Sequence, residues 1–288
     1  MRNSLQFVIA CLLLALNAQA QSAPPLDISR YVSEPSPRVR TIFRVGQRLG
    51  NRADVFAKVG DSITASNMSL RPLGEGVYKL GDYEEAYLAT LQHFSTATAR
   101  TGNSFVNKSL AAKVGWSAFV VLNPDYADPA HCEEGESPLA CEYRLTQPAF
   151  AFIMLGTNDV GFVSEATYRH NLERVLNETI RRGIVPLLST IPPRTDNANI
   201  GEKVMRFNAI VRELAQEYRL PLMDYYALMN TLPDKGLSDD GVHPNVPPRG
   251  YVAVADFNAR DLQYGYTARN LLMLATLDAV WQYLQAEG

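Results

Sequence analysis

The chain has 288 residues, of which 47% are hydrophobic and 20% are charged, and its formal net charge is −3. This composition is typical of a globular protein with one large or two small domains. The balanced charge argues against a strongly basic surface, so we expect no nucleic-acid partner.

The N-terminus has the features of a secretory signal peptide. Arg2 supplies a positive charge, residues 7–16 form an apolar run, and Ala18, Gln19 and Ala20 match a small-x-small cleavage site. The run is too short to span a bilayer comfortably. We therefore expect cleavage near Ala20, a secreted or periplasmic protein, and no stable membrane insertion after cleavage. An uncleaved signal anchor is the alternative.

Cleavage would remove Cys11 and leave two cysteines, Cys132 and Cys141, nine positions apart. In an exported chain such a pair predicts a local disulfide, and two unpaired thiols are the alternative. We expect no metal site, because His131 is the only nearby imidazole and the chain has no second cysteine pair.

The remaining chain predicts one domain with alternating strands and helices. Residues 21–50 show no clear period and are expected to be an N-terminal segment laid over the surface of a domain at 51–288. Apolar runs predict strands at 55–60, 148–156, 183–191 and 220–226. Apolar residues at helical spacing predict helices that include 168–180, 204–218 and 274–284.

This alternation predicts an α/β protein, a three-layer α/β/α sandwich with a central parallel sheet. In such sheets the active groups gather beyond the carboxyl ends of the strands. Ser62 follows the first predicted strand and Asn158 follows the second. Their placement is the first indication that these two residues are functional.

Ser62, in the stretch GDS, is a candidate nucleophile. A serine hydroxyl needs an adjacent base, and His243 lies in a turn-forming segment near the end of the chain, three residues after Asp240. A tight turn at Gly241 would bring the Asp240 carboxylate to one ring nitrogen and leave the other free. A plain Asp-Gly turn with a solvated histidine is the alternative interpretation.

Two positions are candidate hydrogen-bond donors to a tetrahedral oxyanion. Asn158, in the stretch GTND, offers a side-chain amide after a turn at Gly156. Gly115, in KVGWSA, lacks a side chain, so its backbone N–H can approach a reacting atom. Ordinary turn and loop chemistry would explain both stretches, so each remains open when taken alone.

Taken together and in this order, the motifs VGDSIT, GTND and DGVHP resemble those of the SGNH-hydrolase superfamily, also called GDSL esterases and lipases. The resemblance covers roughly residues 52–285. It implies a flavodoxin-like SGNH-hydrolase fold, with Ser62 as the nucleophile, His243 as the base and Asp240 as the orienting acid. It implies no cofactor and no metal.

The resemblance also implies an oxyanion hole formed by the backbone of Ser62, the backbone of Gly115 and the side-chain amide of Asn158. Two features depart from the family pattern. Ile63 replaces a leucine, although both are apolar packing residues. The second block reads NKSLAAKVGWSA, with fewer Gly and Asn residues than usual, so its donor lies either at Gly115 or near Asn107.

The reaction implied is hydrolysis of a small-molecule or carbohydrate ester through an acyl-enzyme, with short acyl chains on carbohydrate as the first choice. A GDSL-type lipase or phospholipase, an acyltransferase, and a non-catalytic carbohydrate-binding protein on this fold are the alternatives. Aromatic residues within 246–266 would line a sugar platform or an acyl tunnel, or simply pack over the sheet edge. Residues 121–147 would form a rim over the site or a surface excursion.

Overall fold

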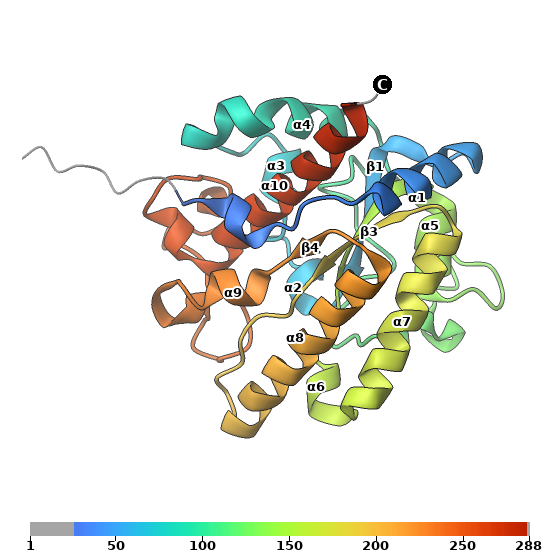
Figure 1. Ribbon diagram of the computed structural model, residues 1–288. Helices are drawn as coiled ribbons and strands as arrows, with labels where there is room; N and C mark the ends of the chain where they lie inside the picture. Colours follow the sequence, from blue (N-terminus) through green and yellow to red (C-terminus); the bar gives the residue numbers. More distant parts are fainter. Residues whose placement is uncertain (1–25, 287–288) are drawn as a thin grey trace, which may run out of the picture.

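The computed structural model describes residues 26–286 (Figure 1). The predicted signal peptide and its cleavage site near Ala20 lie outside the described residues. Within 26–286, none of the helices combines the length and the apolar character needed to cross a membrane.

The described chain alternates between short strands and helices. The strands are β1 (Arg52–Gly60), β2 (Pro148–Met154), β3 (Val185–Ser189) and β4 (Leu222–Met223). The α-helices are α1 (Pro37–Arg48), α2 (Ser62–Ala65), α3 (Arg71–Gly74), α4 (Glu84–Thr96), α5 (Pro138–Thr146), α6 (Asp159–Phe162), α7 (Glu165–Arg181), α8 (Ala198–Tyr218), α9 (Tyr225–Met229) and α10 (Gly265–Gln285). Short 3-10 helices are η1 (Ile28–Tyr31), η2 (Gly81–Tyr83), η3 (Val120–Leu122), η4 (Pro124–Tyr126), η5 (Pro233–Gly236), η6 (Gly250–Ala253) and η7 (Asp261–Gln263).

The strands form a parallel sheet in the order β1-β2-β3-β4. Gly60, the last residue of β1, pairs with Met154 of β2 and also forms a parallel bridge with Ala112. The chain therefore leaves β1 toward residues 109–112 on one side and later builds β2 to β4 on the other. The strand order therefore reverses at the end of β1. Open α/β sheets bind ligands at such a switch point. The predicted α/β fold with a parallel sheet is confirmed.

One face of the sheet is covered by α1, α4 and α10. Phe150 of β2 contacts an aromatic ring from each helix, with centroid distances of 5.8 Å to Phe43, 5.7 Å to Phe94 and 6.4 Å to Trp281. Figure 1 shows α4 lying against α10. The apolar face predicted for 274–284 therefore packs in the core.

The other face is covered by α5, α7 and α8. Tyr168 of α7 stacks on Phe207 of α8 with ring centroids 4.2 Å apart. Tyr143 of α5 shares a hydrogen bond of 3.0 Å with Thr179 of α7. Figure 1 shows α7 and α8 running beside one another. Helices on both faces complete the α/β/α sandwich.

The N-terminal segment contains a regular helix, α1, that the sequence pattern did not reveal. Ser36 caps it by accepting a hydrogen bond of 3.2 Å from the N–H of Arg38, and Pro37 occupies the first turn. Val39 and Ile42 are buried one helical turn apart. This part of the segment therefore belongs to the helical layer that covers one face of the sheet.

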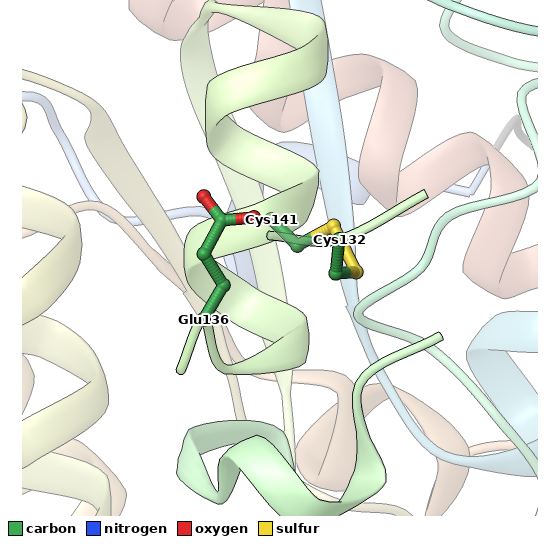
Figure 2. Close-up of side chains that lie close together, drawn as sticks. All are labelled: Cys132, Glu136 and Cys141. Carbon is green, nitrogen blue, oxygen red and sulfur yellow. A yellow bond between two sulfur atoms is a disulfide. The ribbon is translucent and has the colours of Figure 1, made fainter. Parts of the chain in front are cut away.

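Cys132 and Cys141 form the predicted disulfide, which ties the preceding loop to α5 (Figure 2). The Glu136 side chain lies close to the two sulfurs. Its carboxylate accepts hydrogen bonds of 2.7 and 2.8 Å from the Arg144 guanidinium. Because disulfide sulfurs are not thiolates, this group lacks the ligands that a zinc site requires.

We predict that replacing both cysteines, as Cys132→Ala with Cys141→Ala, lowers the free energy of unfolding by about 2–3 kcal/mol, because the bond restricts a short loop in the unfolded chain. Urea denaturation measures the change. Wild-type protein treated with a thiol reductant should lose a similar amount. An unchanged midpoint in both samples would contradict a structural role for the disulfide.

Candidate active site

Ser62 lies at the junction between β1 and α2. The preceding residue, Asp61, is buried, and its Oδ1 caps α2 by accepting a hydrogen bond of 2.9 Å from the N–H of Ile63. Ile63 is fully buried, which anchors the first turn of α2 to the core. Ser62 is left half-buried at the carboxyl edge of the sheet.

Gly60 allows this sharp junction because the space beside its Cα is already filled. A Cβ at this position would lie 2.3 Å from Thr64 Oγ1 and 2.8 Å from the carbonyl O of Met154. Both distances are far below van der Waals contact. A larger residue would therefore push α2, and Ser62 with it, away from the end of β1.

His243 brings its ring to Ser62 from the turn between η5 and η6. Its Nε2 lies 2.9 Å from Ser62 Oγ, and its Nδ1 lies 2.6 Å from Asp240 Oδ2. Three sequence-predicted residues from two distant parts of the chain are thus joined in one hydrogen-bonded row. The side chains of His243 and Asp240 are 41% and 50% exposed, so the row opens to solvent.

The Asp240 carboxylate is fixed by the turn that carries it. Its Oδ1 accepts hydrogen bonds of 2.9 Å each from the N–H groups of Val242 and His243 and from Ser238 Oγ. Burial opposes ionisation, but these donors and the His243 ring together hold the pKa of Asp240 well below its usual range. The carboxylate therefore stays charged near neutral pH, which favours a proton on His243 Nδ1 and a lone pair on Nε2.

Asn158 and Asp159 follow β2 and hold the loop that contains Gly115. Asn158 Nδ2 donates a hydrogen bond of 2.9 Å to the carbonyl O of Trp116. The buried Asp159 carboxylate accepts from the N–H of Ala118, at 3.1 and 3.2 Å. Burial raises the pKa of Asp159 to about 6, although these backbone donors oppose the shift. The loop is therefore tied to Asn158 through Trp116 and to Asp159 through Ala118.

The residue of this loop that pairs with the end of β1 is Ala112, three residues before Gly115. Gly115 is exposed and has a φ of +79°, whereas Ala112 pairs with Gly60. The other position considered, Asn107, is buried, and its amide donates to Glu142 at 3.0 Å. Ala112 is thus a candidate backbone donor to the oxyanion that the sequence analysis missed. The small residues in the stretch SLAA were the feature that could have indicated it.

The aromatic residues within 246–266 divide between core and surface. Phe257 and Tyr266 are buried and pack in the hydrophobic core, which favours the packing interpretation for these two. Tyr251 is half-buried, and its hydroxyl donates to Glu75 at 2.5 Å.

We predict that Gly60→Ala destabilises the protein by about 1–3 kcal/mol, because the added methyl overlaps Thr64 and the backbone of Met154. The variant should also slow modification of Ser62 by a fluorophosphonate. Urea denaturation and mass spectrometry measure the two effects. Gly161→Ala is the matched control, since a Cβ there has open space. Equal behaviour of the two variants would contradict this account of the junction.

Comparisons with known proteins identify the family of the chain. Residues 59–251 match the GDSL-like Lipase/Acylhydrolase family. The chain is 30% identical over 134 residues to thioesterase 1/protease 1/lysophospholipase L1 of Escherichia coli K12, covering 46% of this chain and 62% of that protein. The chain therefore aligns with less than two thirds of the length of this curated relative.

A solved structure of low sequence identity shares the fold. A catalytic mutant of an acetylxylan esterase from Geobacillus stearothermophilus superposes with a TM-score of 0.51 and 17% identity, covering 79% of this chain and 95% of that chain. A lipase/acylhydrolase from Enterococcus faecalis gives a TM-score of 0.49 and 18% identity, covering 77% and 94%. Because the family match spans more than half of the sequence, the chain belongs to the GDSL-like lipase/acylhydrolase family, within the SGNH-hydrolase superfamily.

Proposed function

We propose that the protein is a serine esterase that hydrolyses short-acyl carboxylic esters, with O-acetyl groups on carbohydrate as the first candidates. The observation that carries the proposal is the hydrogen-bonded row from Asp240 through His243 to Ser62, with distances of 2.6 and 2.9 Å. Family membership supports the same chemistry. The complete row also argues against a non-catalytic binding protein on this fold.

In the proposed mechanism Ser62 Oγ attacks the ester carbonyl and gives its proton to His243 Nε2. The charged Asp240 stabilises the imidazolium that forms. His243 then protonates the departing alcohol, leaving the acyl group on Ser62. A water molecule gives a proton to His243 and attacks the acyl-enzyme, which releases the acid and restores the serine.

The developing oxyanion needs donors at the same edge of the sheet. The backbone N–H of Ser62 is one proposed donor. Asn158 is the second, because its amide has two N–H groups and the bond to Trp116 O uses one of them. The third comes from the loop 112–115. Pairing of Ala112 with Gly60 favours Ala112 over Gly115 for this role.

The preference for short and polar substrates is supported by the cavity beside α2. It is lined mainly by hydroxyl, amide and charged side chains from 64–71 and 106–112, and its volume is about 210 Å³. A volume below the range of cavities that hold a whole drug-sized ligand favours a short acyl group. The fold shared with an acetylxylan esterase is consistent with this preference.

Hydrolysis of long-chain acyl esters or thioesters is the second candidate. Val114, Phe119 and Phe162 are 75%, 48% and 88% exposed, and they lie on the loop and helix that Asn158 connects. Exposed apolar side chains of this kind could hold an acyl chain. The name of the Escherichia coli relative points to the same substrates. An acyltransferase would use the same residues with an alcohol in place of water.

We also propose that the protein is exported, either secreted or periplasmic, and that 51–288 acts as one catalytic domain. The disulfide supports export, because such bonds persist in oxidising compartments.

Ser62→Ala should lower kcat on p-nitrophenyl acetate by at least about 10³-fold, because the nucleophile is lost while the fold is kept. Spectrophotometry of p-nitrophenol release measures the rate. Ser95→Ala is a control, since Ser95 Oγ contacts the carbonyl O of Leu91 within α4, far along the chain from the site. Full activity of the Ser62 variant would refute the proposed mechanism.

The two substrate candidates differ in how the rate depends on acyl length. We expect kcat/KM to be at least about tenfold higher for p-nitrophenyl acetate than for p-nitrophenyl octanoate. A tenfold ratio requires only a modest difference between the two esters in the free energy of transition-state binding. Acetylated xylose should also be a substrate. The reverse order, with octanoate preferred, would support the long-chain candidate instead.

A further inference from the structure

A cavity of about 210 Å³ lies beside α2, the short helix that begins at the proposed nucleophile. One wall is formed by α2 and the residues that follow it, and α2 begins at Ser62. The other wall is formed by residues 106–112, whose last residue pairs with Gly60. Cavities that hold a whole drug-sized ligand measure about 300–1,000 Å³, so this one suits a single group of a larger molecule.

The charged side chains around the cavity are cationic. Lys58, Arg71 and Lys108 line it, and in the part of the chain that the structure describes no lining side chain is acidic. Arg71 forms an ion pair of 2.8 Å with Glu75, which lies outside the lining. The cavity therefore presents positive charge to any group that enters it.

Lys58 is the buried member of this set, with only 7% of its surface exposed. Its Nζ donates a hydrogen bond of 2.7 Å to the carbonyl O of Phe105, and an ammonium has two further donors. Glu142 interacts electrostatically with Lys58. Its carboxylate already accepts hydrogen bonds from the side-chain amide of Asn107 and from the N–H of Leu110, at 3.0 and 2.8 Å. Among the described residues, no carboxylate lies within ion-pair distance of Lys58, so Glu142 offsets the cost of burying this lysine only in part.

Burial lowers the pKa of Lys58 to about 7, while Glu142 opposes this shift and the cations Arg269 and Arg71 add to it. A neighbouring anion would favour the charged ammonium and restore its positive charge. The lysine is therefore poised to gain a counter-ion from a ligand.

Two hydroxyl groups of the lining accept hydrogen bonds from a buried guanidinium. The buried Arg269 of α10 donates to Ser69 Oγ at 2.5 Å and to Thr64 Oγ1 at 3.1 Å. Because each oxygen accepts from the guanidinium, each hydroxyl keeps its own hydrogen for another acceptor. The cavity thus combines cations with hydroxyl donors, which is the set that binds a carboxylate or phosphate oxygen.

From these observations we infer that the cavity beside α2 binds an anionic group, a carboxylate or a phosphate, that the ester substrate carries near its scissile bond. This inference rests on the proposed function, which supplies the position of that bond. It narrows the substrate class to acyl esters of acidic molecules, such as acetylated acidic sugars, or to esters of dicarboxylic acids.

The test compares matched esters that differ in one negative charge. On the acyl side the pair is p-nitrophenyl hemisuccinate and p-nitrophenyl butyrate; on the alcohol side it is 3-acetoxybenzoate and phenyl acetate. The kcat/KM ratio of anionic to neutral ester is measured for wild type and Lys58→Met. Lys203→Met is the matched control, because Lys203 Nζ also donates at 2.7 Å to a backbone carbonyl, that of Val163, but does not line the cavity.

We expect Lys58→Met to lower this ratio by about tenfold in at least one pair, as loss of a hydrogen bond to a charged group predicts, and Lys203→Met to leave it unchanged. If Lys58→Met fails to fold by circular dichroism, Arg71→Gln decides, with an expected two- to fivefold decrease, roughly that of an exposed ion pair. Ratios that stay the same in both pairs would overturn the inference.

Calorimetric titration with succinate and with inorganic phosphate distinguishes binding of a free anion from binding of an anionic ester. Lys58-dependent binding of either anion together with unchanged ester ratios would assign the cavity to a free anion and overturn the substrate inference. Full hydrolysis by Ser62→Ala would instead refute the proposed function, while the titration would still show whether the cavity binds anions.

Discussion

The hydrogen bond between Ser62 and His243 joins two segments that are 181 residues apart, and the rest of the site depends on it. Ser62 is held by the buried end of β1 and by the cap of α2. His243 is held by its own turn, in which the N–H of Ser238 donates to the His243 carbonyl O at 2.9 Å. Asn270 of α10 links the two regions, since its side chain bonds to the N–H of Leu70 and to the carbonyl O of Val254. The packing of α10 therefore connects the segment after the nucleophile with the segment after the base.

The fold was predictable where burial leaves a clear periodic pattern. The strand predicted at 148–156 is β2, which is buried along its whole length, and the helices predicted around 168–180 and 204–218 are α7 and α8. The apolar pattern was less informative where one apolar run contains both a strand and the start of a helix. The run 220–226 contains only a short strand, because Asp224 caps α9 by accepting from the N–H of Ala227. The first half of α10 is buried on all sides. Because it lacks a polar face, its sequence does not show the helical period that predicts an amphipathic helix.

The site was predictable to the extent that its chemistry is local. Asp240 and His243 share one turn, so their spacing allowed a contact that the sequence left as one of two interpretations, and the structure joins both to Ser62 in one row. The loop after residue 107 was not predictable in the same way, because its position depends on pairing with Gly60 and on the buried Asp159, which are tertiary contacts. Lys58 escaped notice for a similar reason: in sequence it is a lysine within an apolar strand, and only the fold shows it lining a cavity beside α2.

Trapping of the acyl-enzyme tests the central claim most directly, because the account requires a covalent bond between the substrate acyl group and Ser62 Oγ. Acid quenching during turnover of p-nitrophenyl acetate, followed by proteolysis and mass spectrometry, should find an acetyl group on the peptide that contains Ser62. Fragmentation should place it on Ser62 and not on Ser66 or Ser69 in the same region. Turnover without any acetyl-enzyme, or acetylation confined to another residue, would contradict the account.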